Sequence, residues 1–153
     1  MASPRTEVPF QRTEPAPVLA AMEGLRVTGK GWVNLSPVLD DPPPAPAPLG
    51  RWFSGRGPAV PHVTWIAPAP GASAVRVGIE HGLGTRARAE LERCGVPPPP
   101  GAVVRQDHPR RGLVVDLPAS LADRDQLDWL LTAASALSRV QVDDRWVAAV
   151  YPG

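Results

Sequence analysis

The sequence predicts an α+β fold: a ferredoxin-like βαββαβ two-layer sandwich over residues 74–151, preceded by a proline-rich extension. Three observations predict it. Residues 74–80 alternate apolar and polar side chains, as a strand with one buried face does. Two segments, 85–94 and 123–137, carry apolar residues at helical spacing. A short polar hairpin, 107–111, separates two further apolar stretches. In order, these elements match a split βαβ unit.

The chain divides into two parts of unequal length. Residues 1–14 are polar and contain Pro4 and Pro9, so we expect a mobile N-terminal arm. Residues 15–153 are expected to form a single α+β domain, which is a normal length for one hydrophobic core.

The extension is expected to add a short helix and one or two strands. Residues 17–24 suit a helix that starts at a proline and stops at a glycine. Residues 31–39 form a predicted strand, which Pro37 confines to a sheet edge or a bulge. Residues 60–67 form a second predicted strand. Between these strands, residues 41–48 have the composition of an extended polyproline connector.

The first half of the core unit begins with a strand and a capped helix. Val75, Val77 and Ile79 give the 74–80 strand its apolar face. Thr85 is a plausible cap for the helix over 85–94, and Gly95 stops it. The buried stripe of this helix is predicted to comprise Ala87, Leu91 and Cys94.

The second half of the core unit is predicted to contain two strands, a helix and a closing strand. Residues 103–106 and 112–117 are predicted strands joined by the polar hairpin, and residues 145–151 are the closing strand. The helix over 123–137 has a leucine- and alanine-rich stripe: Leu127, Leu130, Leu131, Ala134 and Leu137. Because both helices need the same apolar layer, we expect them on one face of the sheet.

A second topology competes with the ferredoxin-like one. The connection between the strands at 60–67 and 74–80 is short enough for a hairpin. In the strict ferredoxin-like order, the strand at 74–80 already has two neighbours. Such a hairpin would therefore displace one of them.

Composition excludes some functional classes. The chain has 16 basic and 15 acidic residues, so bulk charge does not indicate nucleic-acid or membrane-surface binding. Cys94 is the single cysteine, which is typical of a reducing compartment. The apolar stretch 18–22 is far shorter than the roughly 20 residues of a membrane helix. We therefore expect a cytoplasmic protein with neither a membrane nor a nucleic acid as its partner.

One end of the predicted sheet gathers polar side chains. In the split βαβ arrangement the loops 81–85, 107–111 and 139–144 share that end. The candidate ligand-binding residues there are His81, Gly82, Gly84, Thr85, Arg86, Asp107, His108, Arg110 and Arg111. Free N–H groups at a helix start and nearby arginines suit a phosphate or a carboxylate.

A structural interpretation of the same residues stays open. The glycines could simply make a turn, Thr85 could cap its helix, and Asp107 could accept backbone hydrogen bonds. We find no metal-ligand spacing, no nucleophile motif and no cofactor motif. No catalytic residue, metal or cofactor is therefore predicted.

Surplus apolar surface indicates binding of another protein. Trp129 lies off the stripe of its helix, so it should face solvent or an added element. The closing strand is apolar on both faces, and Trp52 and Phe53 lie in a glycine-rich loop. We expect a small non-catalytic protein that binds a protein partner or its own copy. The alternative is a binding or regulatory domain for a small anion around His81 and Arg110.

Overall fold

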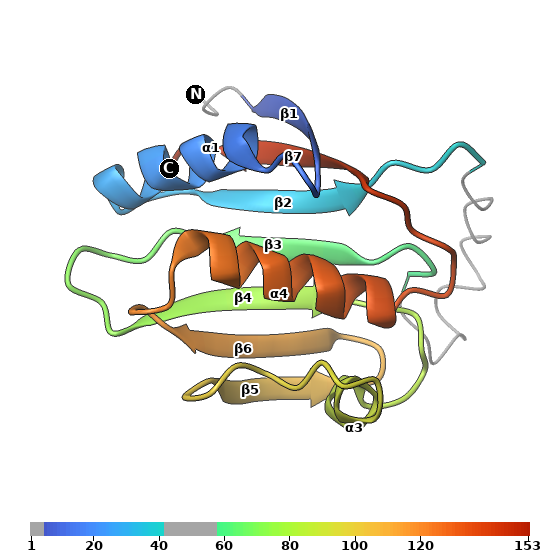
Figure 1. The fold of residues 1–153 in the computed structure, drawn as a ribbon. Helices are drawn as coiled ribbons and strands as arrows, with labels where there is room; N and C mark the ends of the chain where they lie inside the picture. The colour runs from blue at the N-terminus through green and yellow to red at the C-terminus, as the bar shows by residue number, and fades with distance from the viewer. Residues whose placement is uncertain (1–4, 42–57) are drawn as a thin grey trace.

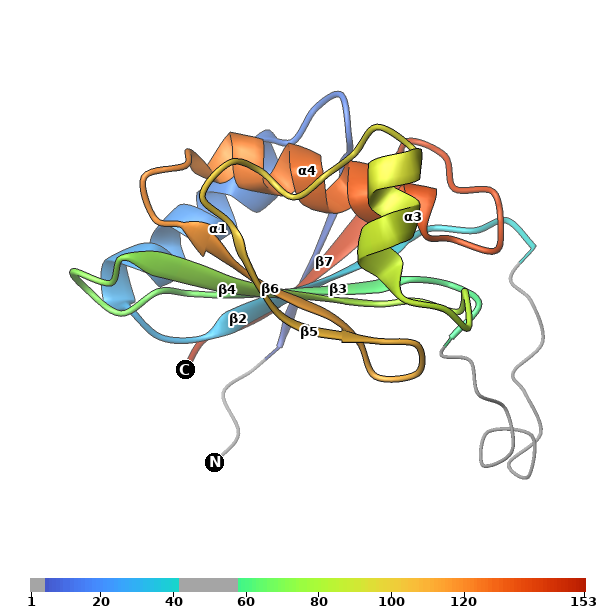
Figure 2. The ribbon, with the colours of Figure 1, turned by 90° about the horizontal axis from the view of Figure 1, so that it is seen from below.

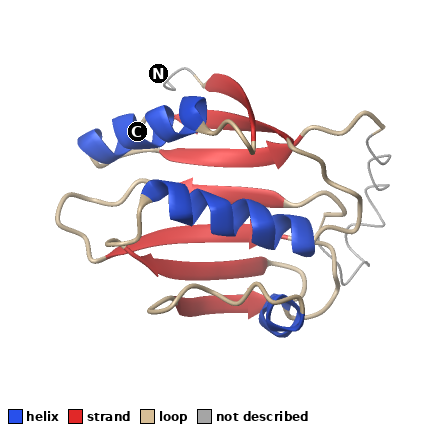
Figure 3. Ribbon diagram, in the orientation of Figure 1, coloured by secondary structure: helices blue, strands red, loops and turns tan. Residues whose placement is uncertain are grey.

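The computed structural model describes residues 5–41 and 58–153, which form one antiparallel seven-stranded sheet with helices on one face (Figures 1 and 2). Figure 3 separates the two layers by colour. The described elements are β1 (Thr6–Gln11), α1 (Ala16–Thr28), β2 (Trp32–Pro37), β3 (His62–Ile66), β4 (Ala74–Glu80), α3 (Ala87–Arg93), β5 (Val103–His108), β6 (Gly112–Pro118), α4 (Asp123–Ala136) and β7 (Arg145–Tyr151). The α+β class is thus confirmed.

The strand order does not confirm the ferredoxin-like topology. The order is β1-β7-β2-β3-β4-β6-β5, so β7 lies between β1 and β2 rather than beside β4. The place beside β4 belongs to β3, with Val63 opposite Ile79 and Trp65 opposite Val77. The competing hairpin therefore forms, because a short connection makes these consecutive strands antiparallel neighbours.

The N-terminal region supplies more structure than its sequence predicted. Residues 6–11 form β1, an edge strand paired with β7 from Thr6↔Val150 to Gln11↔Arg145. An edge strand tolerates Pro9, whose missing N–H interrupts only one side of the strand. The helix α1 runs to Thr28, past the predicted stop at Gly24. It ends at Gly29, whose φ of 68° is left-handed.

The hydrophobic core lies between the sheet and the three described helices (Figure 2). Trp65 and Leu130 are completely buried there. The indole N–H of Trp65 donates a 2.9 Å hydrogen bond to the Gln126 side-chain oxygen, which satisfies a buried polar pair. The expectation that the core-unit helices share one face is confirmed, and α1 joins them there.

Two side chains differ from their predicted positions. Cys94 is exposed because α3 ends at Arg93, so its side chain leaves the buried stripe. Trp129 is buried, at 9% exposed, and its indole N–H donates a 3.0 Å hydrogen bond to the Pro97 carbonyl. The proline-rich segment after α3 therefore covers Trp129, and this side chain is not part of an exposed surface.

Candidate functional site

The sheet face opposite the helices is covered by none of the described elements (Figure 2). Successive strand residues point to opposite faces, so every second residue of each strand lies here. Residues paired across neighbouring strands form rows that run across this helix-free face. Two of these rows define its shape.

The first row is a ridge of large side chains at one end of β2, β3 and β7. Trp32 pairs with Tyr151 on one side and with Ile66 on the other, and Arg76 of β4 continues the row. The rings of Trp32 and Tyr151 stack, with centroids 4.9 Å apart. Trp32 is 41% and Ile66 42% exposed, which is high for apolar side chains of this size.

The second row is a trough of small side chains two residues away from the ridge along each strand. It pairs Ala149, Asn34, Thr64, Gly78 and Val114 in continuous register from β7 to β6. The Thr64 hydroxyl donates a 2.9 Å hydrogen bond to the Asn34 side-chain oxygen. Because Gly78 has no side chain, a shallow hollow of about 250 Å³ opens over β4, between the ridge and the strand ends.

An arginine–aspartate–arginine network lies beside the ridge. Asp116 accepts hydrogen bonds from Arg76, at 2.9 and 3.1 Å, and from Arg105, at 2.8 Å. The two hydrogen bonds from Arg76, and to a smaller extent the one from Arg105, lower the pKa of Asp116 to about 2. The carboxylate thus holds two half-exposed guanidinium groups side by side.

The rim opposite the ridge carries polar side chains from three strands. His62 pairs with Glu80, and the Ser36 hydroxyl lies 3.1 Å from His62 Nδ1. Arg111, from the hairpin after β5, also lines the hollow. The helix-free face therefore has an apolar ridge, a trough of small residues and a charged rim.

The predicted loop end brings His81 and Asp107 together, but on the helix side of the sheet. His81 is fully buried, and its Nδ1 accepts a weak 3.4 Å hydrogen bond from Leu83 N–H. Burial lowers the pKa of His81, while the nearby Asp107 charge opposes that shift. His81 Nε2 is buried and has no hydrogen-bond partner among the described residues.

Asp107 is the residue that caps α3. Its carboxylate accepts hydrogen bonds from Ala87 N–H, at 2.7 Å, and Arg88 N–H, at 3.2 Å. The predicted cap, Thr85, is wrong: the N-cap residue is Arg86, and no side chain within that turn caps the helix. Asp107 reaches the helix from β5, a pairing that local sequence rules do not predict.

The other predicted site residues have mixed surroundings. His108 Nδ1 accepts hydrogen bonds from the N–H groups of Arg110 and Arg111, both at 3.1 Å, so it closes its own turn. Thr85 and Arg86 are exposed. Gly84 has a left-handed φ of 74° in the turn before α3. A side chain at Gly82 would collide with the Pro58 carbonyl.

Two predicted interface residues, Trp52 and Phe53, lie outside the described residues. Sequence patterns do not indicate that Trp32, Tyr151 and Ile66, the ridge residues, form a group. Their shared signal is an exposed-face position in strands that are far apart in the chain.

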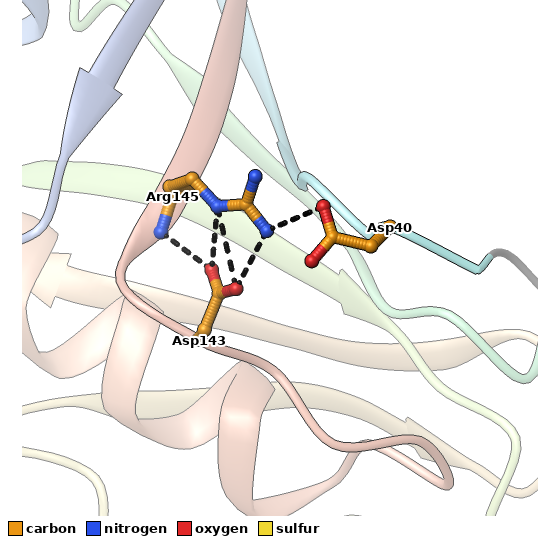
Figure 4. A network of polar contacts seen from close by, with 3 residues as sticks. All are labelled: Asp40, Asp143 and Arg145. Carbon is orange, nitrogen blue, oxygen red and sulfur yellow. Dashed lines mark hydrogen bonds and ion pairs between the residues drawn. The ribbon is translucent and has the colours of Figure 1, made fainter.

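A second polar network lies at the start of β7 (Figure 4). Arg145 lies 2.8 Å from Asp143 and 2.9 Å from Asp40. Its hydrogen bonds lower the pKa of Asp143 and raise that of Arg145 itself. The network fixes the start of β7 beside the segment that follows β2.

Comparisons with known proteins place the chain in no family. No family profile, curated protein or solved structure matches it. In the part of the chain that the structure describes, no cluster of three or more histidine, cysteine or acidic side chains could hold a metal ion. Within the same residues, no helix is long and apolar enough to cross a membrane.

Proposed function

We propose that the protein acts by binding a protein through the helix-free face of its sheet. The observation that carries this proposal is the ridge of Tyr151, Trp32 and Ile66, of which Trp32 and Ile66 are exposed, beside a trough of small residues. Aromatic side chains that enter a partner's pocket contribute a large share of the free energy of association.

The size of the effect can be estimated from Trp32 alone. A tryptophan side chain presents roughly 150–250 Å² of surface, and 41% of the Trp32 surface is exposed. Covering that area at about 25 cal/mol per Å² stabilises a complex by roughly 1.5–2.5 kcal/mol. Ile66 and Tyr151 add further apolar area to the same row.

The polar groups of the face favour docking over chemistry. Arg76 and Arg105 are both bound to Asp116, and Asn34 is bound to Thr64. Side chains already engaged with one another offer a fixed surface to a partner. The apolar ridge is what such a partner would remove from water.

The alternative, a small anionic ligand around His81 and Arg110, has less support. Asp107 already occupies the N–H groups of Ala87 and Arg88, which an anion at the start of α3 would need. The buried position of His81 also keeps its imidazole away from solvent.

The test compares the proteins retained by immobilised wild-type chain with those retained by Trp32→Glu. We expect the variant to lose its partner, because a carboxylate on the ridge would have to be desolvated in the complex. Val27→Glu is the matched control, since Val27 is 80% exposed on α1, on the helix side. Retention of the same partners by Trp32→Glu, with the fold intact by circular dichroism, would contradict the proposal.

A further inference from the structure

We infer that the partner on the helix-free face is a second copy of the same chain, packed face to face about a two-fold axis that runs parallel to the rows. This inference rests on the proposed function and specifies the partner. Three observations support it: the spacing of large and small side chains, the size of the face, and the arrangement of its charges.

The first observation is a repeated size pattern. In four adjacent strands a large residue lies two positions from a small one on the same face: Tyr151 and Ala149, Trp32 and Asn34, Ile66 and Thr64, Arg76 and Gly78. A two-fold axis midway between the ridge and the trough places each ridge over the partner's trough. Such an isologous contact uses one patch twice, so each copy supplies both surfaces.

The second observation is the area of the face. Seven strands about 4.8 Å apart span roughly 30 Å, and five to seven residues per strand extend about 20 Å. The whole face therefore measures about 600 Å², below the roughly 800 Å² per partner of a typical stable interface, and two copies in this register overlap on only part of it, so we expect a weak dimer. The overlap includes the ridge across its full width, whereas a short peptide would leave part of the ridge exposed.

The third observation concerns charge. In this arrangement Arg76 lies over Gly78 of the partner, one side-chain position from the partner's Glu80. The symmetry forms this arginine–glutamate pair twice. Opposite charges thus meet across the axis, which favours this register over one that aligns arginine with arginine.

The sheet edges offer a poorer route to assembly of two copies. Pro9 interrupts the outer edge of β1, and a bulge between Val104 and Gln106 distorts the outer edge of β5. Both are devices that disfavour pairing of an edge strand with another chain. The helix-free face is therefore the surface that a second copy would use.

The experiment measures the mass of the full-length chain by light scattering and sedimentation over a concentration series. We expect a reversible dimer that Thr64→Arg weakens at least tenfold, because the new guanidinium fills the trough. Val27→Arg adds the same charge on the helix side and should leave the dimer unchanged. Trp32→Ala provides a second disruption that removes the ridge instead of filling the trough.

Two results would overturn the inference. One is a wild-type chain that stays monomeric at concentrations on the order of 1 mM, where even weak complexes form. The other is a dimer that persists in both Thr64→Arg and Trp32→Ala. A monomer that still retains a different protein in a Trp32-dependent way would remove this inference and leave the proposed function standing.

Discussion

The two faces of the sheet are built from the same strands and differ in every other respect. On the covered face, Val63 and Trp65 of β3 are fully buried against the helices. On the helix-free face of the same strand, His62 and Ile66 are exposed. The alternation of a single strand therefore separates the residues that stabilise the fold from those available for recognition.

The polar groups on the two faces differ in the same way. Gln126 is fully buried and accepts a hydrogen bond from Trp65, so water does not compete for this hydrogen bond. Asp116, on the other face, is bound by two arginines whose own side chains are more than half exposed. Ion pairs of the second kind are screened by solvent and contribute little to folding.

Truncating the covered face should have the largest effect. Leu131 of α4 is completely buried, so Leu131→Ala leaves a cavity and should lower the free energy of unfolding by about 2–5 kcal/mol. Ile66→Ala on the helix-free face should cost less than about 1 kcal/mol, because much of Ile66 stays in water in both states. Urea denaturation of both variants at low protein concentration measures the contrast. Equal losses for the two variants would show that the second face is also part of the core.

The buried His81 should make the covered side sensitive to acid. Burial lowers its folded-state pKa below the reference value of 6.5, so the unfolded chain binds the proton more readily. Its contribution to stability is therefore present above pH 6.5 and lost as the pH falls toward the folded-state pKa.

The variant His81→Leu removes this titration. Its free energy of unfolding should fall less steeply than that of the wild type between pH 7 and pH 5, as measured by denaturant titration at each pH. Parallel curves for the two proteins would mean that His81 is solvated or paired in solution.

Local sequence patterns predicted where many of the strands and helices lie, but not which strands are neighbours in the sheet. The alternation of residues 74–80 and the apolar run of residues 145–151 each predicted a strand, and β4 and β7 have the predicted bounds. The place of β7 between β1 and β2 depends on strands more than a hundred residues away, which periodicity does not encode. The prolines that suggested an unstructured arm are compatible with β1 because it is an edge strand.

The candidate site was harder to predict for the same reason. Trp32 and Tyr151 stack although more than a hundred residues separate them in the chain. Asp107 caps α3 from a strand that follows the helix. Each pairing joins residues that only the tertiary structure brings together, so composition and spacing identified the polar loop end and missed the ridge.

Replacing Asp116, the buried residue of the arginine–aspartate–arginine network, should have the smallest effect on the free energy of unfolding. Asp116→Asn removes one charge while retaining a side-chain oxygen that can still accept a hydrogen bond. Because the Arg76 and Arg105 side chains are 56% and 54% exposed, we expect a loss of less than about 1 kcal/mol at pH 7. This difference should shrink in high salt, which screens exposed charges.

The pH dependence of the same variant tests the cause of that loss. The Asp116 pKa is lowered from 3.8 to about 2, so its contribution is present above pH 3.8 and lost as the pH falls toward 2. Wild type and Asp116→Asn should therefore converge in stability at the acid end of denaturant titrations. A loss well above 2 kcal/mol at pH 7 would place the network in the folding core. The helix-free face would then stabilise the monomer, and the difference between the two faces would be smaller than burial indicates.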